Sequence, residues 1–223
     1  MTIEQKYYRI ALLFNANKVY DREVVEGVGQ YLQASQCMWD IFVEDEFIYH
    51  KDSINHLSID GIIADFDDAE TVELLEQISI PVIAVGGSYQ NPDFYPNLPY
   101  VATDNYALVE SAFLHLKQKG ITNFAFYSLD TEETRHWANE RKNAFLTLMK
   151  KNEYPSAVYL GGRTHSQNWW QEQHKLTDWL KTLPLHTGII AVTDARARHI
   201  LQAAETAGIA IPEQLCVIGI DNE

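Results

Sequence analysis

Polar side chains stand at the ends of several short apolar runs in this sequence. Asn15 follows the run RIALLF, Asp65 lies near the end of DGIIADF, and Asp221 closes LCVIGID. Carboxylates accept hydrogen bonds and a side-chain amide both donates and accepts them, so this set can bind a polar ligand. Parallel strands place their carboxyl ends along one edge of a sheet, where open α/β folds hold their ligands. We therefore expect a binding crevice at these residues.

No motif for catalysis or for a cofactor accompanies these residues. Gly86-Gly87 and Gly161-Gly162 are isolated pairs without the spacing of a phosphate-binding loop, so they indicate turns. The GxSxG and HExxH patterns are absent, and neither the histidines nor the two cysteines have metal-ligand spacing. Asp65, Asp67 and Asp68 form an acidic cluster that suggests a cation site or, more commonly, a solvated loop. We predict a non-catalytic protein without a cofactor or a metal.

Short apolar runs alternate with longer amphipathic segments along the chain. Strands are expected at 9–14, 39–45, 60–66, 81–87, 100–104, 123–129, 156–162, 187–194 and 215–221. Helices are expected at 20–34, 105–119, 135–151, 169–182 and 195–207. Runs that are apolar on both faces and alternate with helices predict an α/β fold with parallel sheets flanked by helices.

The number of strands favours two lobes over one sheet in a chain of 223 residues. We expect an N-terminal lobe at 1–104 and a C-terminal lobe at 105–223, with a hinge near Thr103-Asp104. No Gly/Ser-rich linker or repeat marks the boundary, so the connection is expected to be short.

Composition and charge exclude several classes of protein. Hydrophobic residues make up 46% of the chain, which is typical of a globular protein and not of a disordered one. The net charge of −14 repels phosphates, so these residues are expected to bind nucleic acid poorly. The apolar stretch Ile10–Phe14 is too short for a signal peptide or a membrane span. We expect a cytoplasmic protein with no membrane partner.

Three motifs, in order along the chain, carry a resemblance to a known family. TDNYALVESAFLHLKQKGITNFAFY (103–127) resembles the HLxxxGHxxIA signature of the LacI/GalR effector-binding fold, which periplasmic sugar-binding proteins share. WANERKNAF (137–145) is similar to the AxxRxxGF segment of that family, and 187–223 is similar to its segment ending in GxDD. Ala144 and Thr193 stand where the family usually has Gly and Asn. The resemblance implies a two-lobed, type I periplasmic-binding-protein-like fold. It also implies that the chain ends at a crossover, with the C-terminal part of the fold absent and the N-terminal lobe incomplete.

A narrower resemblance, to a subgroup of transcription activators, is carried by five stretches: LLFNANKVYDREVVEGVGQYLQAS (12–35), IADFDD (63–68), VGGSY (85–89), ATDNYALVESAFLHL (102–116) and TGIIAVTDARARHIL (187–201). In that subgroup a LacI-like sensor precedes an AraC-type DNA-binding domain. The resemblance implies D-xylose or a related pentose as the effector, activation of xylose catabolic operons, and a homodimer. It implies DNA contact only through a C-terminal AraC-type domain absent from these residues.

A pentose offers hydroxyl groups and apolar C–H faces, so its site needs carboxylates, amides, an arginine fork and an aromatic plate. The resemblance assigns Asp221 and Arg141 to the sugar hydroxyls, and Trp169 to stacking. It also implies that Thr193 reaches the effector while Asp194 caps the following helix.

Three more residues complete the predicted site. Asn15 and Asp21 would contribute from the N-terminal lobe, and Trp137 lies one turn before Arg141, where it could pack beside it. Structural alternatives remain open: Arg141 in a surface salt bridge, Trp169 as a core residue at a helix start, and Asp221 as a turn residue.

The expected mechanism is a change of shape, because residues from both lobes must converge on one ligand. Sugar binding would favour a closed arrangement and alter the geometry of the dimer. Two other functions fit the same pattern: the sugar-binding protein of a transporter, or a pentose-modifying enzyme on a similar fold.

Overall fold

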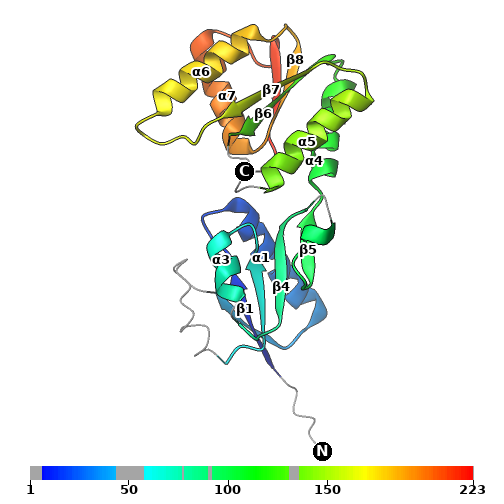
Figure 1. Ribbon diagram of the computed structural model, residues 1–223, viewed down its shortest axis with the longest axis vertical. Coiled ribbons are helices and arrows are strands. Elements are labelled where there is room, and N and C mark those ends of the chain that lie inside the picture. The colour runs from blue at the N-terminus through cyan, green and yellow to red at the C-terminus, as the bar shows by residue number, and fades with distance from the viewer. Residues whose placement is uncertain (1–6, 44–57, 77, 90–91, 131–135, 223) are drawn as a thin grey trace, which may run out of the picture. The chain divides into compact units, whose positions relative to one another are not determined.

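The computed structural model describes residues 7–43, 58–76, 78–89, 92–130 and 136–222 (Figure 1). These residues form two compact units. One unit extends to Thr103, and the other begins at Asp104 and also includes Ser88 and Tyr89. Within the described residues, the chain passes from the first unit to the second at Gly87-Ser88 and, after returning to the first unit, again at Thr103-Asp104.

The first unit is built on a five-stranded parallel sheet with the strand order β2-β1-β3-β4-β5. The strands are β1 (Tyr8–Leu13), β2 (Trp39–Val43), β3 (Gly61–Asp65), β4 (Val82–Gly87) and β5 (Tyr100–Thr103). Helix α1 (Val19–Ser35) packs on one face over Leu12, Phe14 and Val85. Helix α3 (Ala69–Leu75) packs on the other face, and the short helix η1 (Pro92–Phe94) precedes β5.

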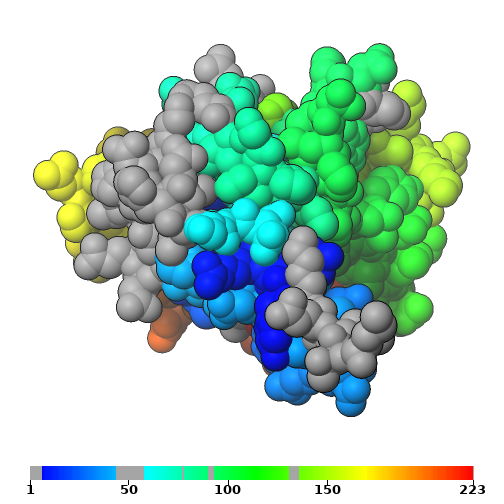
Figure 2. All heavy atoms as spheres, turned by 90° about the horizontal axis from the view of Figure 1, so that it is seen from below, coloured from blue at the N-terminus to red at the C-terminus, as the bar shows by residue number. Residues whose placement is uncertain are grey.

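The amino ends of these strands face the viewer in Figure 2, where the blue of β1 lies beside the cyan of the residues leading into β3. Arg9 anchors this end, because its backbone N–H donates to Asp60 (2.9 Å) and its guanidinium lies 3.6 Å from Asp40. The polar strand ends predicted from sequence lie at the opposite, carboxyl end of the sheet, as a parallel arrangement requires.

The second unit is built on a four-stranded parallel sheet with the strand order β7-β6-β8-β9. Its strands are β6 (Asn123–Leu129), β7 (Ser156–Gly161), β8 (Thr187–Ala191) and β9 (Leu215–Ile218). Its helices are α4 (Asn105–Gln118), α5 (His136–Lys151), α6 (Trp169–Thr182) and α7 (Asp194–Ala207).

Side chains of the second sheet alternate between two cores. Phe124, Phe126 and Ile190 point toward α4 and α5, whereas Ala125 and Tyr127 point toward α6 and α7. Figure 1 shows these two helix pairs on opposite sides of the sheet. Both faces of the strands are buried, which explains their continuous apolar runs.

The predicted α/β class, with parallel sheets flanked by helices, is confirmed. All nine expected strands and five expected helices are present within a few residues of their predicted bounds. Helix α3 was not predicted, because its seven residues are too few for a clear helical period. The strands β8 and β9 end before Asp194 and Asp221, since the chain turns there. Within the described residues, no helix is both long and apolar enough to cross a membrane.

Candidate functional site

Arg141 is the centre of a buried polar cluster in the second unit. It lies on α5 and is only 5% exposed. Its Nε donates to Asn105 Oδ1 (3.0 Å), and its Nη1 donates to the carbonyl oxygen of Val192 (2.6 Å) and to Asp221 Oδ1 (3.0 Å). A buried guanidinium requires such partners, because an unpaired charge in a protein interior costs several kcal/mol. The alternative of a surface salt bridge is therefore wrong.

Asp221 reaches Arg141 from a strained turn after β9. Its φ of 115° is unusual for a residue with a side chain, and Asn222 follows with a φ of 61°. The turn is held near α7, because the backbone N–H of Asp194 donates to the carbonyl oxygen of Ile220 (2.8 Å). Gly219 permits this approach, since a Cβ there would lie 2.9 Å from the Cα of Asp194.

Trp137 lies beside the Arg141 guanidinium, as the sequence predicted. The guanidinium carbon is 4.9 Å from the centre of the indole ring. Three of the predicted site residues are thus brought together: an arginine, a carboxylate and an aromatic ring. These are the groups that recognise hydroxyls and an apolar sugar face.

Sequence reasoning missed two residues of this cluster, Asn105 and Glu140. Asn105 is 1% exposed, and its Nδ2 donates to Glu140 Oε2 (2.8 Å) while its Oδ1 accepts from Arg141. Glu140 Oε2 also accepts from the Ser88 hydroxyl (2.6 Å). The available signal was the position of Asn105, which directly follows the residue predicted to cap its helix. Asp104 does cap α4, accepting from the N–H of Ala107 (2.9 Å).

The roles expected of Thr193 and Asp194 differ in the structure. Thr193 is the N-cap of α7, and its Oγ1 accepts from the N–H of Arg196 (3.3 Å). Asp194 is the first helical residue, so the prediction that it caps the helix is wrong. Thr193 has the extended backbone of a cap residue, which leaves its side chain oriented toward the first helical turn. Contact of Thr193 with an effector stays a prediction.

Trp169 lies at the start of α6 and contacts α7 rather than the Arg141 cluster. Its ring packs edge-to-face on His199, with the ring centres 4.9 Å apart. A shallow cavity of about 280 Å³ lies beside it and is lined by Trp169, Trp170, Gln173, His174, Thr177, Gln202, Glu205 and Thr206. Burial, with help from Arg196 and Arg198, lowers the pKa of His199 to about 4. The structure therefore places Trp169 on the α6/α7 side of the sheet, whereas Arg141 lies on α5.

A second buried arginine, Arg196, was also missed by sequence reasoning. Its Nη1 donates to the Tyr127 hydroxyl (2.9 Å) and its Nη2 to the carbonyl oxygen of Gly162 (2.9 Å). It therefore ties the carboxyl ends of β6 and β7 to the first turn of α7. Gly161 has to be small here, because a Cβ would lie 2.4 Å from the Tyr127 ring.

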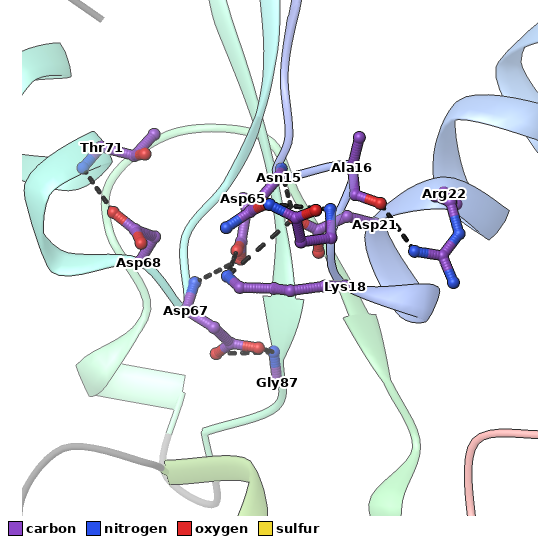
Figure 3. Close-up of polar contacts among 11 residues, drawn as sticks. Asn15, Ala16, Lys18, Asp21, Arg22, Asp65, Asp67, Asp68, Thr71 and Gly87 are labelled. Carbon is purple, nitrogen blue, oxygen red and sulfur yellow. Dashed lines mark hydrogen bonds and ion pairs between the residues drawn. The ribbon is translucent and has the colours of Figure 1, made fainter. Parts of the chain in front are cut away.

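In the first unit, Asp21 and Asn15 lie together at the carboxyl end of the sheet (Figure 3). Asp21 Oδ2 accepts from the backbone N–H of Asn15 (2.7 Å) and lies 3.9 Å from the Lys18 ammonium. Lys18 extends to Asp65, where its Nζ donates to Oδ2 at 2.6 Å. Asp21 is 1% exposed, and its Oδ1 has no hydrogen-bond partner.

Burial raises the pKa of Asp21 to about 6, and the nearby charge of Asp65 adds to the rise. The Asn15 N–H and the Lys18 ammonium act in the opposite direction. Burial lowers the pKa of Lys18, but its hydrogen bond and charge interaction with Asp65 outweigh that effect, so the net shift is upward. This end of the sheet thus holds an ammonium between carboxylates, one of which titrates near neutral pH.

The acidic cluster in the loop after β3 has structural contacts (Figure 3). Asp65 pairs with Lys18, and Asp68 caps α3 by accepting from the N–H of Thr71 (3.0 Å). Asp67 accepts from the N–H of Gly87 at 2.9 Å. Among the described residues, no group of three or more acidic, histidine or cysteine side chains has the arrangement of a metal site. The cluster is therefore an ordered turn in which Asp65 is buried and Asp67 is exposed, so it is only partly solvated.

Comparison with protein families assigns both parts of the chain. Residues 9–106 match the XylR N-terminal domain, and residues 113–223 match a periplasmic binding protein-like domain.

Relatives of the chain are similar over almost all of its length. The xylose operon regulatory protein of Haemophilus influenzae is 68% identical over 98% of the chain, which covers 57% of that protein. The protein of the same name from Escherichia coli K12 is 57% identical, with 98% of the chain and 56% of that protein covered. The chain thus spans little more than half the length of these relatives.

A solved structure of the xylose-binding transcription activator xylR has a TM-score of 0.88 at 56% identity. That match covers 98% of the chain and 55% of the solved one. A solved structure of a LacI family regulator from Enterococcus faecium, with bound ribose, has a TM-score of 0.67 at 19% identity. The match covers 97% of this chain and 78% of the regulator's chain. At this low identity it supports the fold alone.

Proposed function

This chain belongs to the family of the xylose operon regulatory proteins, and from that premise we propose that it is the D-xylose-sensing domain of a cytoplasmic transcription activator of xylose catabolic operons. The proposal extends to a homodimer and to DNA contact through an AraC-type domain. The relatives' printed names support the regulatory role, and the solved relative is described as xylose-binding.

The observation that carries the proposal is the Arg141–Asp221 pair beside Trp137. Sugar hydroxyls both donate and accept, so a carboxylate and a guanidinium held together can bind neighbouring hydroxyl groups. The indole ring offers an apolar surface for the C–H face of the ring. Asn15 and Asp21 are proposed as the contribution of the first unit. Thr193, Asp194 and Trp169 lie at or near the carboxyl end of the second sheet and stay as proposed contacts.

The proposed action is binding without chemistry. A sugar held by residues of both units favours the arrangement in which all of them can touch it, and it shifts the population by its difference in affinity. In a homodimer, this change would alter the relation between the subunits and hence between their DNA-reading domains. The identification of 1–104 and 105–223 as the two lobes is part of the same proposal.

Titration calorimetry against D-xylose, L-arabinose, D-ribose and D-lyxose tests the proposal. We expect D-xylose to bind most tightly and to be recovered unchanged. Asp221→Asn should weaken binding at least about tenfold, because it removes a charged acceptor worth roughly 1.5–3 kcal/mol. The matched control is Asp178→Asn, whose side chain is 80% exposed on α6 and should bind as wild type does. Failure of wild type to bind any pentose, or conversion of the sugar, would overturn the proposal.

A further inference from the structure

Two passages of the chain from the first unit to the second lie among the described residues, and each of these two is fixed on both of its sides. At the first passage, Gly87 forms hydrogen bonds within the first unit, where its N–H donates to Asp67 and its carbonyl oxygen accepts from the Tyr100 hydroxyl (2.9 Å). The next residue, Ser88, donates to Glu140 of the second unit. Only the link between Gly87 and Ser88 separates these two sets of contacts.

The second passage has the same construction. Thr103 Oγ1 lies 3.0 Å from the Tyr20 hydroxyl, within the first unit. Asp104 then caps α4, and Asn105 bonds to Glu140 and Arg141, all within the second unit. At each of these two passages, only a few backbone torsions separate the contacts of the first unit from those of the second, which is the local construction of a hinge.

One carboxylate oxygen connects the two passages on the side of the second unit. Glu140 Oε2 accepts from Ser88 at 2.6 Å and from Asn105 at 2.8 Å. Asn105 uses its other amide atom to accept from Arg141 Nε. Arg141 in turn donates to Asp221. A continuous series of hydrogen bonds therefore runs from the first passage, through Glu140 and Asn105, to the Arg141–Asp221 pair.

The burial of this series makes it sensitive to small displacements. Asn105 is 1% exposed and Arg141 is 5% exposed, so water cannot readily replace a lost partner. The amide of Asn105 has one acceptor and one donor side, and both are engaged. A shift of the guanidinium must therefore move the Asn105 side chain or break the hydrogen bond between Asn105 and Arg141. Either event alters the hydrogen bonds that Glu140 accepts from Asn105 and Ser88.

We propose that Glu140 and Asn105 are positioning residues that couple the Arg141–Asp221 pair to both hinge passages. The inference deepens the proposed function and rests on it for the identity of the effector. Occupancy of the pair by a sugar is then transmitted to the passages through side-chain bonds, in addition to direct bridging of the units by the ligand. The coupling itself is a property of the unliganded protein.

A double-mutant cycle read by hydrogen exchange tests the coupling without sugar. Exchange is measured by mass spectrometry on peptides covering Val85–Tyr89 and Thr103–Leu108, in wild type, Asp221→Asn, Asn105→Ala and the double variant. We expect Asp221→Asn to speed exchange at least threefold in both peptides, because the Arg141 guanidinium then faces a neutral amide in place of a carboxylate and is held less firmly. In the Asn105→Ala background the same change should add nothing. Asp178→Asn serves as the control and should leave both peptides unchanged.

A second pair of variants covers the case in which Asn105→Ala does not fold. Glu140→Gln retains a carbonyl oxygen that can accept both bonds, so the effect of Asp221→Asn on the peptides should persist. Glu140→Met removes the acceptor at similar size, and the effect should then be lost at Val85–Tyr89. If Glu140 had only a structural role, Glu140→Met would lower the stability of the protein. The effect of Asp221→Asn on exchange at Val85–Tyr89 would nevertheless persist.

The coupling is overturned if Asp221→Asn leaves both peptides unchanged, or if its effect is equally large with and without Asn105. This result does not depend on whether D-xylose binds. Calorimetry showing no pentose binding would remove the proposed function and leave the cycle valid. With D-xylose present, slower exchange in both peptides of wild type but not of Asn105→Ala supports the coupling, and equal slowing in the two proteins contradicts it.

Discussion

Arg141 and Asp221 lie 80 positions apart in the sequence and form an ion pair of 3.0 Å at the carboxyl end of the second sheet. The pair joins α5 to the turn after β9. Arg141 also donates to the carbonyl oxygen of Val192 and to Asn105 of α4, so the guanidinium connects α5 with α4, with the residue after β8 and with the turn after β9. The contribution of the Arg141–Asp221 pair to stability can therefore be measured by unfolding, apart from its proposed contribution to sugar binding.

Replacing Arg141 by Met should destabilise the second unit by about 3 kcal/mol, because Asp221 and Asn105 lose a buried donor. Adding Asp221→Leu should recover part of that loss, since the carboxylate that faced the guanidinium is then removed as well. Urea unfolding measures the free energy of unfolding of the single variant and of the double variant. Lys181→Met, from an exposed pair at 4.0 Å, should change stability by less than about 0.5 kcal/mol. Equal losses for the single and double variants would contradict this account.

Asp21 should make the first unit less stable as the pH rises. The folded pKa of about 6 exceeds the unfolded value of 3.8, so the folded state holds the proton more tightly. The resulting stabilisation is complete below pH 3.8 and is lost as the pH rises through about 6. Asp21→Asn should remove up to roughly 3 kcal/mol of this pH dependence.

Urea unfolding at several pH values between 4 and 8 measures the effect of Asp21→Asn. The variant should gain stability relative to wild type above pH 6 and not below pH 4. Asp178→Asn, at an 80% exposed side chain, should follow the wild-type curve. Parallel curves for Asp21→Asn and wild type would show that burial of this carboxyl does not control the profile.

Gly219→Ala should disturb the turn that carries Asp221. The new methyl group would clash with the Asp194 carboxylate and lie 2.9 Å from the Asp194 Cα, so either α7 or the turn must shift. We expect a loss of about 1–3 kcal/mol and weaker D-xylose binding. Gly27→Ala is the matched control, because nothing lies within 4 Å of its Cβ position on α1. That helical substitution should instead stabilise by about 0.5–1 kcal/mol.

His199→Phe should stabilise the second unit, and more so in acid. The Nδ1 atom of His199 is buried without a partner, and the ring packs on Trp169, a contact that Phe preserves. The pKa falls from 6.5 to about 4, so the folded state resists protonation. Wild type therefore loses stability as the pH falls from 6.5 toward 4, and the variant should not. Thermal unfolding at pH 5 and pH 8 measures this, with His115→Phe on the surface of α4 as control.

The sequence was sufficient for the fold because its elements are long, apolar and regularly spaced. Phe124–Phe126 and Ile189–Ile190 are buried on both faces, and such runs identify parallel strands. Helix α3 escaped prediction because its seven residues are too few to show a helical repeat of apolar residues. The clearest mark of the helix is its N-cap, Asp68. The predicted ends of β8 and β9 lie three residues beyond the observed ones. The helix-cap and turn residues that follow these strands directly continue an apolar run, so the sequence does not mark where each strand stops.

Part of the site was predictable through the family resemblance. The residues alone showed a carboxylate after an apolar run, Asp221, whereas Arg141 was identified from the resemblance, and the structure pairs the two. Asn105 and Glu140 were missed because their roles depend on contacts across 35 positions, which no local pattern encodes. The contacts of Trp169 with α7 were missed for the same reason. The topology of the fold decides which face of the sheet a helix covers. The sequence of the helix does not reveal it.

The two cores of the second sheet have a consequence for how this protein can change over time. Phe126 belongs to the layer under α4 and α5, whereas Tyr127, its neighbour, belongs to the layer under α6 and α7. Substitutions in one layer share few partners with the other, so their effects on stability should largely add. Descendants of this sequence can therefore change apolar side chains in one layer with little effect on the packing of the other. The sheet works as a partition between two cores that can be repacked one at a time.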